Sequence, residues 1–185
     1  MVPNRAFAHC DGMDGPVVKT AQKALATGDV HLVLIWVQKS DETEIRKAFE
    51  QTVAVRKLSG EARELADRYF FETLVRIHRT GEGAPYTGLK PAGRDLGPAI
   101  PAADKALENR SVEPLRKLLS EAVGEGVREK FTQALAKADF PKEDVESGRA
   151  YVKGYVEFIH YVERIYEAAE SPVSGHFQES EEAVQ

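Results

Sequence analysis

Cysteine, methionine and tryptophan are scarce in this chain of 185 residues, and long apolar runs are missing. Cys10 is the single cysteine, so no disulfide can form within the chain. The longest apolar run, 30–37, is far shorter than the roughly 18 residues that a membrane-spanning helix needs, and His31 interrupts it. We therefore expect neither a disulfide framework nor a membrane span.

The familiar motifs of nucleotide-binding and hydrolytic sites are also missing. The sequence contains no P-loop, dinucleotide fingerprint, nucleophile elbow, H-E-x-x-H or paired C-x-x-C. Its formal net charge is -5, whereas proteins that bind nucleic acids typically carry an excess of positive charge. We expect no nucleic-acid partner, whereas assembly of several copies into a homo-oligomer stays open.

Helical periodicity dominates what is present, and alternating strand patterns are nearly absent. Hydrophobic residues make up 42% of the chain, enough for a core at this length. The sequence predicts an all-α protein, an antiparallel helical bundle with one long Gly/Pro-rich loop. The expected helices cover 16–28, 31–37, 41–56, 59–81, 101–108, 111–138 with a break at Gly124 and Gly126, and 141–170.

Helix start signals and the composition of the ends predict three regions. Residues 1–13 form an N-terminal extension, 14–170 the helical bundle domain, and 171–185 a disordered acidic tail. Asp14 is the expected cap of the first helix, Asp41 with Glu44 forms a capping-box pattern, and Ser59 caps the next helix.

The Gly/Pro-rich loop spans 81–101 and is unusually long for a compact domain. Loops of this length are usually functional or disordered, and Tyr86 and Leu89 are apolar anchors that favour packing against the bundle. Glu82, Arg94 and Asp95 are candidates for lining a pocket beneath it.

Potential metal ligands crowd into the segment that precedes the first helix. His9, Cys10, Asp11 and Met13 supply imidazole, thiolate, carboxylate and thioether groups, a mixture that suits a late transition metal. The alternative is that Cys10 is a small buried hydrophobe and Met13 packs at the start of the helix. Residues 6–8 have the small-x-small form of a signal-peptidase site, and cleavage there would give His9 a free amine. An ordinary chain start is the other interpretation.

Further candidate ligands lie on the predicted core helices. Glu157 and His160 form an E-x-x-H, whose spacing places both side chains on one helix face. Glu72 and His78 lie on another predicted core helix, and His31 opens an apolar segment. The competing interpretation makes Glu157 a surface acid and His160 a hydrogen-bonded residue at the edge of the core.

Several segments resemble an uncharacterised prokaryotic family of helical proteins. They are AHCDGMDGPVV, VHLVLIWVQK, YFFETLVRIHRTGEGAPYTGLKPAG and YVEFIHYVERIYEAA. This resemblance implies a helical fold and no particular activity. Members often carry an export signal before the AHCD motif, so it favours an exported or periplasmic protein over a cytoplasmic one.

A shorter stretch resembles the metal hook of the nickel superoxide dismutases. His9 and Cys10 match the first His and first Cys of that hook, whereas Asp14 stands at the second Cys position. The resemblance implies nickel ligation by the His, its amine and the Cys. Loss of the second thiolate argues against dismutase activity.

The leading hypothesis from the sequence is therefore a metal-binding helical bundle of unassigned reaction, with redox chemistry as one option. Zinc, copper and nickel all fit the donor types. The expected ligands are His9, Cys10, His31, Glu72, His78, Glu157 and His160. The alternatives are a non-catalytic interaction or structural protein, and a small-molecule binder with its pocket under the 81–101 loop.

Overall fold

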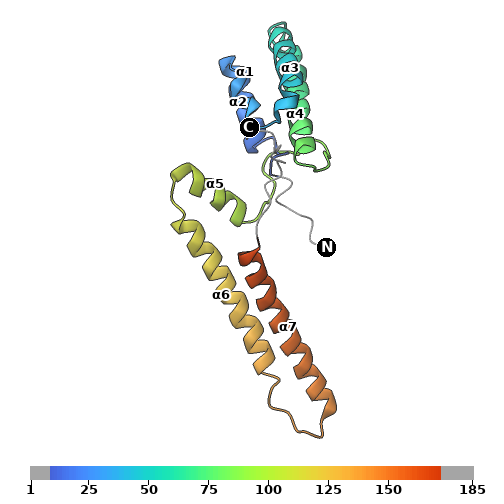
Figure 1. Cartoon of the computed structure of the whole chain (residues 1–185), viewed down its shortest axis with the longest axis vertical. Coiled ribbons are helices and arrows are strands. Elements are labelled where there is room, and N and C mark those ends of the chain that lie inside the picture. The colour runs from blue at the N-terminus through green and yellow to red at the C-terminus, as the bar shows by residue number, and fades with distance from the viewer. Residues whose placement is uncertain (1–8, 172–185) are drawn as a thin grey trace, which may run out of the picture. The chain divides into compact units, whose positions relative to one another are not determined.

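The computed structural model describes residues 9–171 (Figure 1). The predicted cleavage site at 6–8 and the acidic tail from 172 onwards lie outside the described residues. Every regular element in the described range is a helix, which confirms the all-α prediction. No helix in this range is both long and apolar enough to cross a membrane.

The helices follow one another in the order that Figure 1 labels. They are α1 (Pro16–Thr27), α2 (His31–Leu34), the short 3-10 helix η2 (Lys39–Asp41), α3 (Glu42–Val55), α4 (Gly60–Gly81), α5 (Ala99–Asn109), α6 (Glu113–Leu135) and α7 (Val145–Glu170).

The described residues divide into two compact units, 9–96 and 97–171. The first unit contains α1 to α4, in which α3 and α4 form an antiparallel hairpin (Figure 1). The second contains α5 to α7, in which α6 and α7 form a longer antiparallel hairpin. The domain boundaries at 13/14 and 170/171 stay predictions.

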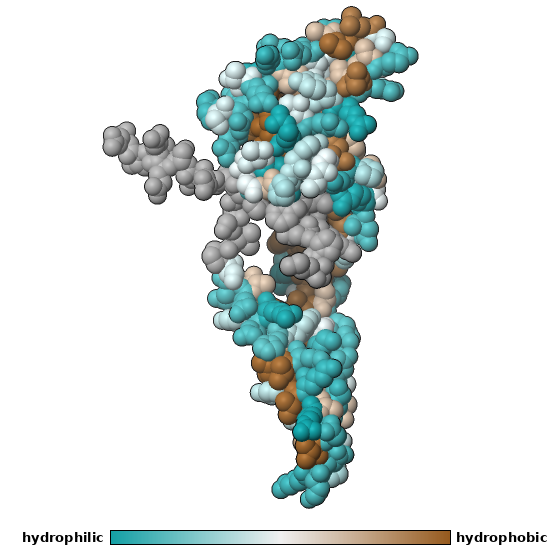
Figure 2. Space-filling model, turned by 90° about the vertical axis from the view of Figure 1, so that its right-hand side faces the viewer, coloured by the Kyte–Doolittle hydropathy of each residue, from teal (hydrophilic) through white to brown (hydrophobic). Residues whose placement is uncertain are grey.

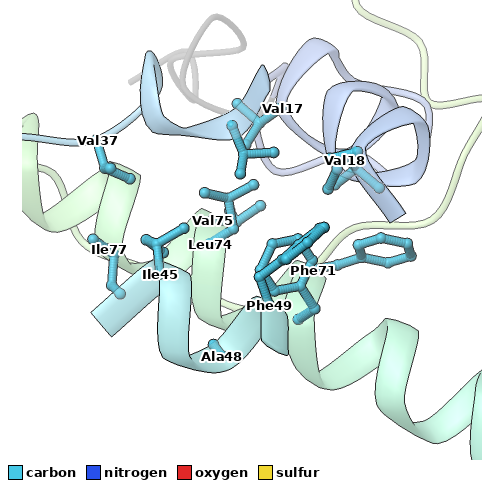
Figure 3. Close-up of a cluster of buried hydrophobic side chains, with 14 of the residues drawn as sticks. Val17, Val18, Val37, Ile45, Ala48, Phe49, Phe71, Leu74, Val75 and Ile77 are labelled. Carbon is cyan, nitrogen blue, oxygen red and sulfur yellow. The ribbon is translucent and has the colours of Figure 1, made fainter. Parts of the chain in front are cut away.

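The buried hydrophobic core belongs to the first unit, where one face of α4 packs against α1 and α3 (Figure 3). Phe70 and Leu74 on α4 are fully buried, and the ring of Phe70 meets that of Phe49 on α3 edge to face at 5.5 Å. Tyr86 and Leu89 of the Gly/Pro loop pack against this core, which confirms their role as anchors.

An ion pair holds the first half of α4 against its neighbours. Arg56, just after α3, donates two hydrogen bonds to Asp67 on α4, at 2.8 and 3.0 Å. Its third donor reaches the carbonyl of Leu25 on α1 at 2.6 Å. Both charged side chains are 21% exposed, so this bidentate pair is partly shielded from water and links three helices.

One of the three predicted helix caps is confirmed, and two are wrong. Ser59 caps α4 as expected, because its hydroxyl accepts a hydrogen bond from the N–H of Ala62. The predicted Asp14 cap is wrong, since Gly15 is the N-cap of α1 and makes no side-chain bond. The predicted capping box is also wrong, because Asp41 ends a 3-10 turn and its backbone is already helical.

Several predicted helix boundaries differ from the structure. The apolar segment 31–37 is helical only as far as Leu34. The last helix begins at Val145 rather than at residue 141, and Asp144 caps it by accepting the N–H of Ser147. The predicted break in the sixth helix is wrong, because α6 runs on through Gly124 and Gly126.

The second unit buries few residues, and its helices approach each other through small side chains. Ala134 on α6 and Gly154 on α7 are the buried residues of its three helices. A Cβ at Gly154 would lie 3.3 Å from the Cα of Ala134. The hydroxyl of Tyr161 packs on Gly126 in the same way, at 1.8 Å from where a Cβ would be. Close approach therefore explains why α6 keeps that glycine.

Two glycines of α6 allow a matched test of this packing. Gly124→Ala should raise the free energy of unfolding by about 0.5–1 kcal/mol, since alanine suits a helix interior and nothing lies near the new Cβ. Gly126→Ala should lower it, because the Cβ collides with Tyr161. Chemical unfolding followed by circular dichroism measures both. Equal changes in the free energy of unfolding for the two substitutions would contradict the close approach of Tyr161 to Gly126.

Candidate metal centre

Two candidate ligands come from the end of α4. His78 lies in its last turn with 2% of its surface exposed, and Glu82 is the residue that caps the helix C-terminus. Residues four apart share one face of a helix, so the two side chains meet. The Nε2 atom of His78 lies 3.3 Å from Oε1 of Glu82.

The third ligand comes from the hook, defined as residues 9–15. The N–H of Gly15 donates to the carbonyl of Gly12 at 2.8 Å, and that of Gly12 donates to the carbonyl of His9 at 3.4 Å. A Cβ on Gly15 would lie 2.1 Å from the His9 oxygen, so only glycine permits so tight a turn. This turn brings Cys10 to α4, and one donor atom each from Cys10, His78 and Glu82 lie within 4.8 Å of one another.

Main-chain bonds to the Gly/Pro loop hold the hook in place. The N–H of Met13 donates to the carbonyl of Lys90 at 2.9 Å, and the N–H of Lys90 donates to the carbonyl of Asp11 at 2.8 Å. A little further on, the Asp14 carboxylate accepts the N–H of Gly93 at 2.8 Å. The loop thus fixes the hook from outside while Cys10 and Met13 pack against the core.

A backbone carbonyl orients the ring of His78. Its Nδ1 lies 2.8 Å from the carbonyl oxygen of Trp36, which can only accept, so Nδ1 carries a proton. In the neutral ring, Nε2 then has a lone pair, and it has no hydrogen-bond partner among the described residues. Metal-binding histidines typically donate their second ring nitrogen in this way.

The Glu82 carboxylate that faces Nε2 of His78 is also an acceptor, so no donor lies between these two atoms when the ring is neutral. A lone pair opposite a carboxylate oxygen is unfavourable unless a proton or a metal cation lies between them. Tetrahedral Zn²⁺ with bonds of about 2.0–2.2 Å to nitrogen and oxygen holds these atoms about 3.3–3.5 Å apart. The 3.3 Å between His78 and Glu82 matches this separation.

Buried charges surround the three donors. The other oxygen of Glu82 accepts a hydrogen bond from Arg79 at 3.0 Å, which leaves Oε1 for His78. Arg79 also pairs with Asp11 at 3.4 Å, and both side chains are at most 5% exposed. Burial raises the pKa of Asp11 above its ordinary 3.8, although the charge of Arg79 opposes this rise. With Cys10 as thiolate, three acids would face the buried guanidinium of Arg79 and the more exposed ammonium of Lys90, and a metal cation would offset the remaining negative charge.

The structure brings two of the seven predicted ligands together. Cys10 and His78 belong to the donor group, and His9 lies in the hook beside them, half-buried. His31 is exposed and pairs with Asp29 at 3.0 Å. The side chain of Glu72 is 45% exposed and pairs with Arg68 at 3.1 Å.

The two predicted ligands on α7 belong to the second unit. His160 is 59% exposed and its ring pairs with Glu163 at 3.0 Å, while Glu157 lies near Lys153 at 3.9 Å. Neither belongs to the donor group found among the described residues. The E-x-x-H of the sequence is therefore part of an exposed helix surface in its own unit.

The sequence prediction missed the role of Glu82 and the charges behind it. Glu82 was a candidate for lining a pocket, although its position four residues after His78 is a signal for a shared helix face. The contacts of Asp11 with Arg79 have no such signal, because they join segments nearly 70 residues apart in the chain.

A family model described as "Family of unknown function (DUF6448)" matches residues 14–161. The chain belongs to this family. No curated protein and no solved structure matches it. Membership confirms the uncharacterised family and assigns no activity, while the likeness to the hook of nickel superoxide dismutases stays a prediction. The matched range includes His78 and Glu82 and begins after Cys10.

The Asp14 carboxylate gives a test of how the hook is held. Its bond from Gly93 lowers its pKa below the ordinary 3.8, so the ionised form stabilises the fold above that pH. This contribution is lost as the pH falls through the lowered pKa. Asp14→Asn should therefore be less stable than the natural protein at neutral pH, and the gap in melting temperature should close as the pH falls below 3.8. A gap that is independent of pH would contradict this.

Proposed function

We propose that the first unit is a metal-binding domain that holds one divalent transition-metal ion. The ligands are Sγ of Cys10, Nε2 of His78 and Oε1 of Glu82. The observation that carries the proposal is the orientation of His78, whose Nδ1 donates to the Trp36 carbonyl and whose Nε2 faces the carboxylate and the hook.

Zn²⁺ is the ion that this donor set favours. One sulfur, one nitrogen and one oxygen suit a borderline-soft cation, and zinc imposes no geometry beyond the tetrahedron. Three protein ligands leave a fourth position, the pattern of catalytic rather than structural zinc sites. A water bound there would be acidified, so hydrolysis is the reaction class that such a centre would support.

The competing state of the same residues is an ion pair without metal. If Nε2 carries a proton, His78 and Glu82 pair directly, and Cys10 is a small side chain packed beside them. Metal binding and this ion pair predict different behaviour of Cys10, because only a metal ion would bond its sulfur.

Metal titration of the full chain, purified without an affinity tag, separates the two states. After chelator treatment, the protein should bind Zn²⁺ with a stoichiometry of about one per chain. Cys10→Ser, His78→Gln and Glu82→Gln should each weaken binding by about 100-fold or more, since even indirect partners contribute about 10–100-fold. His31→Gln and His160→Gln are matched controls that should bind as the natural protein does.

Cobalt reports directly on the bond between the metal ion and the sulfur of Cys10. Co²⁺ in the site should show a thiolate-to-metal charge-transfer band that disappears in Cys10→Ser, a change at a half-buried position. Binding that is unaltered by Cys10→Ser, or no stoichiometric binding at all, would overturn the proposal.

A second candidate function rests on a cleft beside the hook. It has a volume of about 560 Å³, within the range of small-molecule sites. Its lining comes from α4, the hook and the loop: Met13, Glu64, Asp67, Arg68, Phe71, Leu89, Lys90 and Pro91. This observation favours the small-molecule alternative, with apolar walls and charges of both signs as the recognition elements.

A further inference from the structure

Helix α7 carries an apolar row that its own unit leaves exposed. We call this row the seam. Its members repeat every seven residues, with a second set three positions later, which is the a and d pattern of a coiled coil. They are Val145, Val152, Tyr155, Ile159, Val162 and Tyr166. Their exposed fractions range from 38% for Val162 to 66% for Tyr166.

The seam is distinct from the face of α7 that contacts α6. That face contains Gly154 against Ala134, Phe158 edge to face with Phe131, and Tyr161 against Gly126. At 100° per residue, the centre of the seam lies about 120° around the helix from the centre of this face. Helix α7 is therefore apolar on two sides, and α6 covers one of them.

Helix α6 extends the same exposed surface. Phe131 and Leu135 on α6 line a hollow of about 200 Å³ together with Tyr151 and Tyr155 on α7. Figure 2 shows hydrophobic side chains exposed along this hairpin. So large an apolar surface on a unit with so few buried residues indicates an interface.

We propose that a second copy of this chain covers the seam, with the two α7 helices antiparallel. A repeat of seven residues over more than three heptads is typical of a helix that packs against another helix. The 26 residues of α7 give a contact about 39 Å long. Two hairpins joined in this way form a four-helix bundle, which supplies the core that one hairpin lacks.

The charges beside the seam fit the antiparallel direction. We place the two-fold axis of the antiparallel pair at position 157. Val152 of one copy then meets Val162 of the other, and Tyr155 meets Ile159 in the same way. Arg149 and Glu163 flank the seam on one side. Arg149 lies between positions 148 and 152, and Glu163 lies between positions 162 and 166, which are the two intervals that face each other in this register. Each Arg149 then lies opposite Glu163 of the second copy, and the two-fold axis produces this pair twice.

A parallel pairing fits less well. It would place Glu163 beside Phe158 of the second copy, where no cation meets it. It would place Arg149 near Asp144 of the second copy, whose carboxylate already caps α7 through Ser147. In one copy alone, Arg149 and Glu163 pair with Glu146 and His160, and both pairs are exposed and easily exchanged.

Sedimentation equilibrium of the full chain over a wide concentration range tests the proposal. The natural protein should be a dimer, with or without a chelator, because the seam is independent of the metal ligands. Arg149→Glu and Glu163→Arg should each weaken the dimer by about 10-fold, since each places like charges together twice. The double variant should return to within about 3-fold of the natural dissociation constant.

Two further variants control for folding and for the seam itself. Ile159→Asp should abolish the dimer, and Lys153→Glu, on the same helix outside the seam, should leave it unchanged. Circular dichroism reports whether each chain stays helical. A natural protein that is monomeric throughout would overturn the proposal, as would a dimer in which the double exchange fails to rescue the single ones.

Discussion

The hydrogen bond from His78 to the carbonyl of Trp36 is the interaction on which the candidate site depends. It joins the segment after α2 to the last turn of α4, and it fixes which ring nitrogen is left for a metal ion. Helix α2 ends at Leu34, and a longer helix there would have used the Trp36 carbonyl for its own next turn. The early end of this apolar segment therefore creates the acceptor that orients the histidine.

Much of the first unit could be predicted from the sequence because local rules govern it. The periodicity of α4, its Ser59 cap and its end near Gly81 are set by residues close together in the chain. The crowding of donor types before the first helix predicts Cys10 as a ligand, and the apolar neighbours of His78 on a core helix predict the histidine. Glu82 lies just beyond the helix, and its place among the donors depends on the packing of the hook against α4. Such contacts depend on how distant segments pack, which no local pattern encodes.

Helix α7 shows why the E-x-x-H motif could not be located from periodicity. Residues three apart share a face whether that face is buried or exposed, and α7 has two apolar faces. Glu157 and His160 lie on the polar surface that remains between them. The apolar neighbours Ile159 and Tyr161 made His160 resemble a core residue, although each belongs to a different face. The sequence shows that a helix is amphipathic more readily than it shows which partner covers each side.

The two-way main-chain bridge between Lys90 and the hook has a consequence for how this family can vary. Because peptide groups make the bridge, most side chains of the loop can change without moving Cys10. The number of residues between Gly81 and Lys90 is more constrained than their side chains, since it determines where Lys90 meets the hook. Divergent relatives that keep the site should thus tolerate substitutions in this stretch while resisting insertions and deletions.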